Sequence, residues 1–248
     1  QQGTVIDSCA RADEVEEAIA SCARVDDVEE ALAEVVDHPT LYEDTDIRVG
    51  GYVKTDAILS DYSRAPTRGA GDDFFIPSTI NTFGESAGPQ LNLHAKETRC
   101  WLKSYTPTGR GDISTHFEID FLAGQQGDER VGNSFSARIR HASINWERWT
   151  VGQTWTNFFN VATLPDYLDF IGPVGVTFAR QAQVRYTAPV ENGDWAISRE
   201  NPETTLTPYG GGPRIDADEG RFPDVVVRRN WHGDWGRFSA AALVRELR

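Results

Sequence analysis

The chain has 248 residues, of which 24 are basic and 38 are acidic, so its formal net charge is −14. This acidic balance argues against nucleic acid as a partner and against an anchor on an anionic membrane leaflet. No stretch approaches the roughly 18 consecutive apolar residues of a membrane-spanning helix. A transmembrane β-barrel is compatible with the mean hydropathy of −0.46, because its strands cross with about 10 alternating residues.

Residues 1–40 differ in composition from the rest and contain an internal repeat, in which residues 21–32 resemble residues 8–19. Small or apolar residues recur in steps of three or four from Cys9 to Val35, which predicts a helix with one buried seam, and Pro39 ends it. Because this helix has charged flanks and no core of its own, we expect it to form a coiled coil with copies of itself. The alternative is one solvated helix that lies against the following domain, 41–248.

From residue 47 onward, short segments alternate apolar and polar residues between Gly, Asn, Asp and Pro turns. A period of two predicts strands with one apolar and one polar face. Nine strands are expected, near residues 47–59, 91–105, 112–122, 135–145, 148–156, 178–187, 194–200, 225–231 and 237–247. Short turns such as 107–111 and 232–234 alternate with long connections such as 61–90 and 200–223, as in a barrel with one plain and one functional rim.

The alternation also assigns faces. In a soluble protein the apolar face would line a core, whereas in an outer-membrane barrel it contacts lipid and the polar face lines a wet lumen. The residues assigned to the lumen as candidate solute-binding groups are Arg48, Lys54, Asp56, Glu118, Asp120, Arg138, Arg140, Gln181, Gln183 and Arg185, together with Ser114 and His116. Between residues 91 and 103 the facing is irregular, because Glu97 and Arg99 share parity with Leu93 and Ala95, so we expect a bulge there.

The lumenal cations have two interpretations of equal weight. In the first, a basic ladder binds solute carboxylates through the planar fork of the guanidinium group. The ladder consists of Arg138, Arg140 and Arg185, joined by Lys54 and Arg99. In the second, each arginine pairs with Glu118, Asp120 or Asp56 and stiffens the wall.

Residues 157–177 are the expected constriction loop. They lie between two strands and combine aromatic side chains with Asp166 and Asp169. So many aromatic groups are costly to leave in water, which favours a loop folded into the pore, or aromatic groups that cover a trimer interface.

Enzymatic and metal chemistry find little support. The five histidines lack the spacing of a metal site, and the sequence has no Gly-rich phosphate loop. His116, Glu118 and Asp120 resemble a glycosidase acid cluster, but such strand carboxylates are far more often solvated lumen groups. We therefore predict no catalytic residue, no metal site and no cofactor.

Several segments resemble, in order, the DcaP-like family of outer-membrane porins. They are residues 51–58, 93–99, 102–103, 106–108, 112–121, 138–142, 151–156, 168–173, 180–187 and 200–202. The resemblance implies a sixteen-stranded antiparallel barrel that forms homotrimers in the outer membrane of Gram-negative bacteria, in contact with the lipid bilayer and lipopolysaccharide. It also implies a periplasmic N-terminal coiled coil and passage of small anionic solutes such as dicarboxylates.

About nine strands are present in the sequence, so we expect further polypeptide to complete the ring. An open sheet in lipid would leave the backbone groups of its edges unpaired. The competing interpretation is a secreted or periplasmic β-sandwich, displayed on a coiled coil, that binds carbohydrate through tryptophans such as Trp146, Trp149 and Trp155. Aromatic girdles at the lipid interface explain these residues better, and a requirement for detergent separates the two classes.

Overall fold

A computed structural model of the chain describes residues 44–63, 83–86, 88–122, 124, 126–128, 130–132, 134–165, 176–206, 215–217 and 220–247. Thr45–Arg248 form one compact unit. The described residues are all-β apart from one 3-10 turn, Val161–Thr163. The predicted helix of residues 1–40, with its coiled coil, lies outside them. No helix in the described part of the chain is long and apolar enough to cross a membrane.

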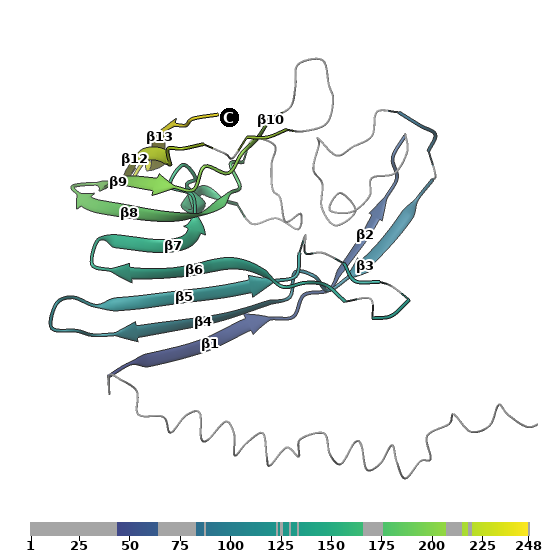
Figure 1. The fold of residues 1–248 in the computed structure, drawn as a ribbon, viewed down its shortest axis with the longest axis horizontal. Coiled ribbons are helices and arrows are strands. Elements are labelled where there is room, and N and C mark those ends of the chain that lie inside the picture. The colour runs from purple at the N-terminus through teal and green to yellow at the C-terminus, as the bar shows by residue number, and fades with distance from the viewer. Residues whose placement is uncertain are drawn as a thin grey trace, which may run out of the picture. The chain divides into compact units, whose positions relative to one another are not determined.

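Nine strands form one antiparallel sheet, as Figure 1 shows. They are β1 (Asp46–Tyr52), β4 (Arg99–Thr106), β5 (Ile113–Asp120), β6 (Arg138–Trp146), β7 (Trp149–Trp155), β8 (Arg180–Val190), β9 (Gly193–Glu200), β12 (Asp224–Gly233) and β13 (Gly236–Val244), and this is also their order across the sheet. Two small antiparallel pairs stand apart from it. These pairs are β2 (Asp56–Ser60) with β3 (Gln90–His94), and β10 (Thr205–Leu206) with β11 (Ile215–Asp216).

Two of the predicted strands are wrong as continuous elements. The strand expected at 47–59 is divided into β1 and β2, and the one expected at 91–105 into β3 and β4. The second division is a turn, in which the amide of Thr98 donates to the carbonyl of Ala95 at 3.1 Å. A turn at this place explains the irregular parity that suggested a bulge. The small pair β10 and β11 was not predicted, because strands of two residues carry no periodic signal.

The connections of the sheet differ between its two ends. Residues 107–112, 147–148, 191–192 and 234–235 make short turns at one end (Figure 1), and longer connections leave the other. Two of the short turns hold a residue in the left-handed region, with φ of 49° at Glu147 and 58° at Asn192, as in the turn types that two-residue hairpins favour. The predicted alternation of short turns and long loops is therefore present.

The two faces of the sheet are inverted relative to a soluble protein. On one face Ile144, Val151 and Val184 are paired in register across three strands and are about half exposed, while Val49 is 74% exposed. The opposite face is polar, and Asp120 on it is completely buried. The described residues with buried apolar side chains are Leu122, Phe159, Ala196, Ala217 and Val226. A β-sandwich would bury an apolar core between its sheets, so this burial pattern favours a wall whose apolar face meets lipid.

Aromatic side chains gather on the apolar face toward the short turns. Trp146 is paired with Trp149, and Trp149 with Tyr186, whose ring centroid lies 4.9 Å from that of Trp149. On the neighbouring hairpin the rings of Trp231 and Phe238 lie 5.4 Å apart. Amphipathic rings of this kind mark the interface between hydrocarbon and lipid headgroups in outer-membrane barrels.

Candidate functional site

The polar face is organised by the register of the sheet. One row of directly paired residues crosses eight strands. Its members are Arg48, Lys103, His116, Ser143, Gly152, Gln183, Glu200 and Asp224. Directly paired residues of an antiparallel sheet lie on the same face, so the row forms a continuous polar strip without an aliphatic or aromatic hydrocarbon side chain.

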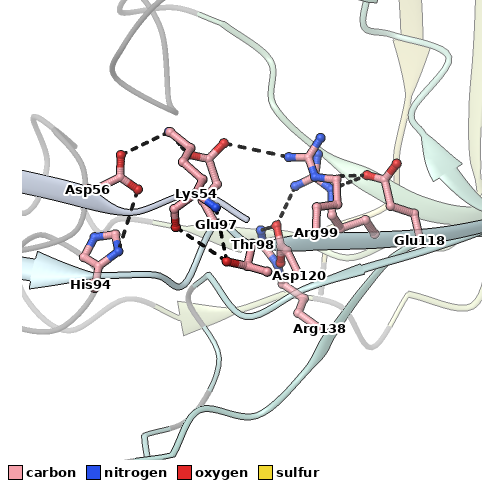
Figure 2. A network of polar contacts seen from close by, with 10 residues as sticks. Lys54, Asp56, His94, Glu97, Thr98, Arg99, Glu118, Asp120 and Arg138 are labelled. Atoms are coloured by element: carbon pink, nitrogen blue, oxygen red, sulfur yellow. Dashed lines mark hydrogen bonds and ion pairs between the residues drawn. The ribbon is translucent and has the colours of Figure 1, made fainter. Parts of the chain in front are cut away.

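Asp120 is the centre of an ion-pair network on this face, part of which Figure 2 shows. Its carboxylate accepts hydrogen bonds from Arg138 at 2.8 and 2.7 Å and from Arg140 at 2.7 Å. Arg140 also donates to Glu118 at 2.5 Å. One buried carboxylate is thus shared by two guanidinium groups.

A β-bulge lies next to the two arginines on β6. The register between β5 and β6 shifts between Glu118 and Ile119. Asp120 is opposite Arg138 and Glu118 is opposite His141, so Arg140 is the extra residue. Strand parity alone assigns Arg138 and Arg140 to this face, and the bulge adds His141 to them.

The network continues to the break between β1 and β2 (Figure 2). Lys54 forms ion pairs with Glu97 and, at 3.2 Å, with Asp56. Arg99 lies 3.5 Å from Glu118 and 3.9 Å from Glu97. Glu97 therefore connects Lys54 and its partner Asp56 with Arg99, and Arg99 connects them with the Asp120 cluster through Glu118. The sequence had assigned Lys54, Asp56 and Arg99 to the lumen. Strand alternation assigns no role to Glu97, because the facing of its side chain depends on the unpredicted turn at residues 95–98.

Lys54 lies outside the strands of the large sheet. Partial burial acts to lower the pKa of its ammonium group, but the hydrogen bonds to Glu97 and Asp56 outweigh burial and raise that pKa above its usual value. The Lys54 side chain is therefore charged throughout the physiological pH range.

Two histidines stack beside this network. The rings of His116 and His141 are nearly parallel, with centroids 4.8 Å apart. His141 is hydrogen-bonded through Nδ1 to the Thr154 hydroxyl at 3.0 Å, and His116 lies 3.5 Å from Glu118. Within the described ranges, no group of three or more His, Cys, Asp or Glu side chains is arranged to hold a metal ion.

A second buried network is centred on Glu200, which is 2% exposed. Its carboxylate accepts hydrogen bonds from the Thr156 hydroxyl at 2.5 Å, the Ser198 hydroxyl at 2.6 Å and the Asn157 amide at 2.8 Å. The Asn157 side chain donates in turn to the carbonyl of Val226 at 3.3 Å. These contacts attach the start of the connection after β7 to β9 and β12. Strand alternation along β9 is the sequence signal that identifies this face, because it puts Ser198 and Glu200 on one face and Ile197 on the other.

That connection is the predicted constriction loop. Its described part contacts the sheet, because the Arg228 guanidinium donates to the carbonyl of Phe159 at 2.7 Å and the Phe159 ring lies 5.3 Å from that of Trp155. Asp166 and Asp169, the acidic residues assigned to the constriction, lie outside the described residues.

The remaining predicted site residues have separate positions. Gln183 donates to the carbonyl of Trp155 at 2.8 Å and Gln181 to that of Glu203 at 3.3 Å, so the first amide ties β8 to the end of β7 and the second ties β8 to the connection after β9. Arg48 is exposed and pairs with Asp46 at 2.7 Å. Within the part of the chain that the structure describes, no carboxylate forms an ion pair with Arg185, and its Nε atom is buried without a hydrogen bond.

Arg180 is a similar cation that the sequence did not single out. Its guanidinium lies 3.8 Å from the centroid of the Trp155 ring and 5.0 Å from that of Phe178. Its Nε and Nη2 atoms are buried and have no hydrogen-bond partner among the described residues. Alternation along β8 gives Arg180 the parity of Val184, but its electrostatic interactions with Arg140, Arg138 and Asp120 put its guanidinium beside the Asp120 network. The cations near this network and on the polar face thus fall into two groups. Arg138, Arg140, Arg99 and Lys54 form ion pairs with acidic side chains, whereas Arg180 and Arg185 form none among the described residues.

Comparisons with known proteins agree with this architecture. The family model described as DcaP outer membrane protein matches residues 22–224. The crystal structure of the outer membrane channel DcaP of Acinetobacter baumannii is similar, with a TM-score of 0.62 and 27% sequence identity, over 81% of this chain and 53% of that chain. The chain therefore spans about half the length of the solved channel.

No curated protein matches the chain. The family match nevertheless covers most of its length and confirms the resemblance seen in the sequence. The apolar exposed face and the polar buried face are what such a protein requires. The chain belongs to the DcaP outer membrane protein family and is a protein of the outer membrane.

Proposed function

We propose that the protein is a diffusion channel for small hydrophilic solutes, with a preference for anions such as dicarboxylates. The observation that carries this proposal is the inversion of the sheet, in which hydrocarbon side chains are exposed and charged side chains are buried. In lipid such a wall turns its polar strip toward an aqueous lumen. A pore needs no reacting group, only charges that replace part of the hydration shell of a solute.

The preference for anions follows from Arg180 and Arg185. Arg138 and Arg140 are neutralised by Asp120 and Glu118, so they contribute little net field to the lumen. Arg180 and Arg185 keep donors without hydrogen-bond partners in the described structure. A planar guanidinium whose charge is not cancelled by an ion pair attracts a carboxylate and can bind it through two hydrogen bonds.

The complete assembly is a further part of the proposal. β1 and β13 are the two edges of the nine-stranded sheet, and backbone groups at such edges require partners in the hydrocarbon region. We place these strands in a closed ring of sixteen, associated as a homotrimer, with the N-terminal helix in the periplasm as a coiled coil. The family membership supports this arrangement.

Reversal potentials in planar bilayers under a salt gradient test the function. Full-length protein is expected to give conductance steps with a reversal potential of the sign that anion preference produces. The double variant Arg180→Gln, Arg185→Gln is expected to shift that potential toward zero or beyond it, because two lumenal charges are lost. Arg110→Gln, in the exposed turn between β4 and β5, is the matched control and should leave the potential unchanged. Absence of conductance would refute the channel, and an unchanged potential in the double variant would refute these two residues as selectivity groups.

A further inference from the structure

Arg199 interrupts the apolar face of the sheet. It is paired with Val184 on β8 and with Val225 on β12, in the row that also contains Val151 and Ile144. Its side chain is exposed on that face, and in the described residues no carboxylate forms an ion pair with it. A guanidinium among valines that face lipid requires an anionic partner or a position near the headgroups.

The position of Arg199 along its strand indicates which headgroups are near. It is the residue before Glu200, where β9 ends and the long connection to β12 begins. Short turns of outer-membrane barrels face the periplasm and long loops face the outside. Arg199 therefore lies at the end of the sheet that adjoins the outer leaflet.

A second arginine, Arg221, lies near Arg199. A shallow depression of about 510 Å³ surrounds Arg199 and is also lined by Arg221. The backbone amide of Arg221 donates to the Glu246 carboxylate at 2.9 Å, which fixes this residue beside β13, and its side chain is exposed. The apolar side chains of the lining are those of Val151, Ala182, Val184, Pro202, Phe222 and Pro223. Glu200 also borders the depression, but its carboxylate is held by Thr156, Asn157 and Ser198.

We propose that this depression binds a phosphorylated glycolipid of the outer leaflet. Arg199 and Arg221 contact the phosphate, with charge-assisted hydrogen bonds from both guanidinium groups. An acyl chain lies along the valines and Phe222. The paired charge and hydrocarbon lining match an amphiphile rather than a free anion. The inference rests on the proposed function, through the orientation of the barrel. Because lipid binding is measured without conductance, failure of the lipid site is distinguishable from failure of the channel.

Lipid titration of the full-length protein in detergent, followed by native mass spectrometry, tests the site. The probes are bisphosphorylated lipid A and its dephosphorylated counterpart. The protein is expected to bind the bisphosphorylated form at least about tenfold more tightly, since each charge-assisted contact favours the phosphate. The double variant Arg199→Gln, Arg221→Gln should lose this preference, and Arg199→Lys, Arg221→Lys should keep most of it.

The control is Arg110→Gln, Arg148→Gln, which removes two exposed arginines at the short-turn end and should leave lipid binding unchanged. Heat-dependent mobility on SDS gels checks that every variant is folded. Equal binding of both lipids, or unchanged binding in the Gln variant, would overturn the proposal. Full displacement of lipid A by inorganic phosphate would instead indicate a free-anion site. If the Arg199→Gln, Arg221→Gln variant lost its oligomeric state while lipid binding was unchanged, a second copy of the chain would cover Arg199. Both this result and displacement by inorganic phosphate contradict a lipid site.

Discussion

Asp120 shows how single residues make the polar face stable. Its carboxylate is fully buried and accepts three hydrogen bonds from Arg138 and Arg140. A buried carboxylate is costly in free energy unless it is paired and hydrogen-bonded, and removing one partner leaves the other charges uncompensated. The two arginines that the sequence suggested as solute ligands are thus the counter-charge of a structural carboxylate.

Asp120→Asn should therefore destabilise the folded protein, by about 3–5 kcal/mol in free energy of unfolding. The measurement is the temperature at which the folded band is lost on SDS gels. Asp128→Asn is the control, because Asp128 pairs with Arg130 in an exposed loop, where the hydrogen bonds from Arg130 lower the pKa of its carboxyl group. An exposed pair contributes little to stability, so equal losses in the two variants would contradict the role given to Asp120.

At the scale of an element, Glu200 attaches the connection after β7 to the sheet. Three donors converge on its carboxylate, two of them from residues 156 and 157 at the start of the connection. Hydrogen bonds to a charged acceptor are stronger than neutral ones and are the main polar contacts of this segment with β9. Glu200 therefore determines where the connection enters the polar face.

Glu200→Gln is expected to weaken this attachment by about 1.5–3 kcal/mol, since the charge and one acceptor are lost. Local opening should then increase roughly tenfold to hundredfold, and limited proteolysis within residues 157–165 should accelerate accordingly. The matched control is Glu203→Gln, an exposed glutamate that accepts from Asn201. If cleavage rates are the same in the Glu200 variant and the unaltered protein, Glu200 does not hold the connection.

Sequence alternation predicted the strands from β5 to β9 well, because each has a side-chain period of two between recognisable turns. It did not predict the turn at residues 95–98, since parity carries no information on where a strand stops and a turn replaces it. His141 and Glu97 were missed for the same reason, as the bulge and the turn determine their facing. The sequence also did not show that Arg138 is paired with an acidic residue on the neighbouring strand whereas Arg185 is not, because such pairs depend on the register between strands.

Across the whole molecule, the inversion of the two faces is the feature on which the proposed function rests. The exposed valines, leucines and phenylalanines would be an aggregation hazard in water but suit a surface in contact with lipid. The polar strip, the aromatic girdle and the alternation of short turns with long connections are consistent with one orientation in the outer membrane. In that orientation the polar face meets water and the apolar face meets lipid.

Labelling at Leu102 and Lys103 tests the surroundings of the two faces. The two residues are adjacent on β4, both are exposed, and the register puts Leu102 with Phe117 and Lys103 with His116 on opposite faces. Leu102→Cys and Lys103→Cys are made in full-length protein whose own cysteines, including the exposed Cys100, are replaced by serine. In lipid bilayers, a membrane-impermeant maleimide is expected to label position 103 and not position 102, whereas denatured protein is labelled at both. Equal labelling of the two positions in the bilayer, or labelling of position 102 alone, would contradict a polar face in water and an apolar face in lipid.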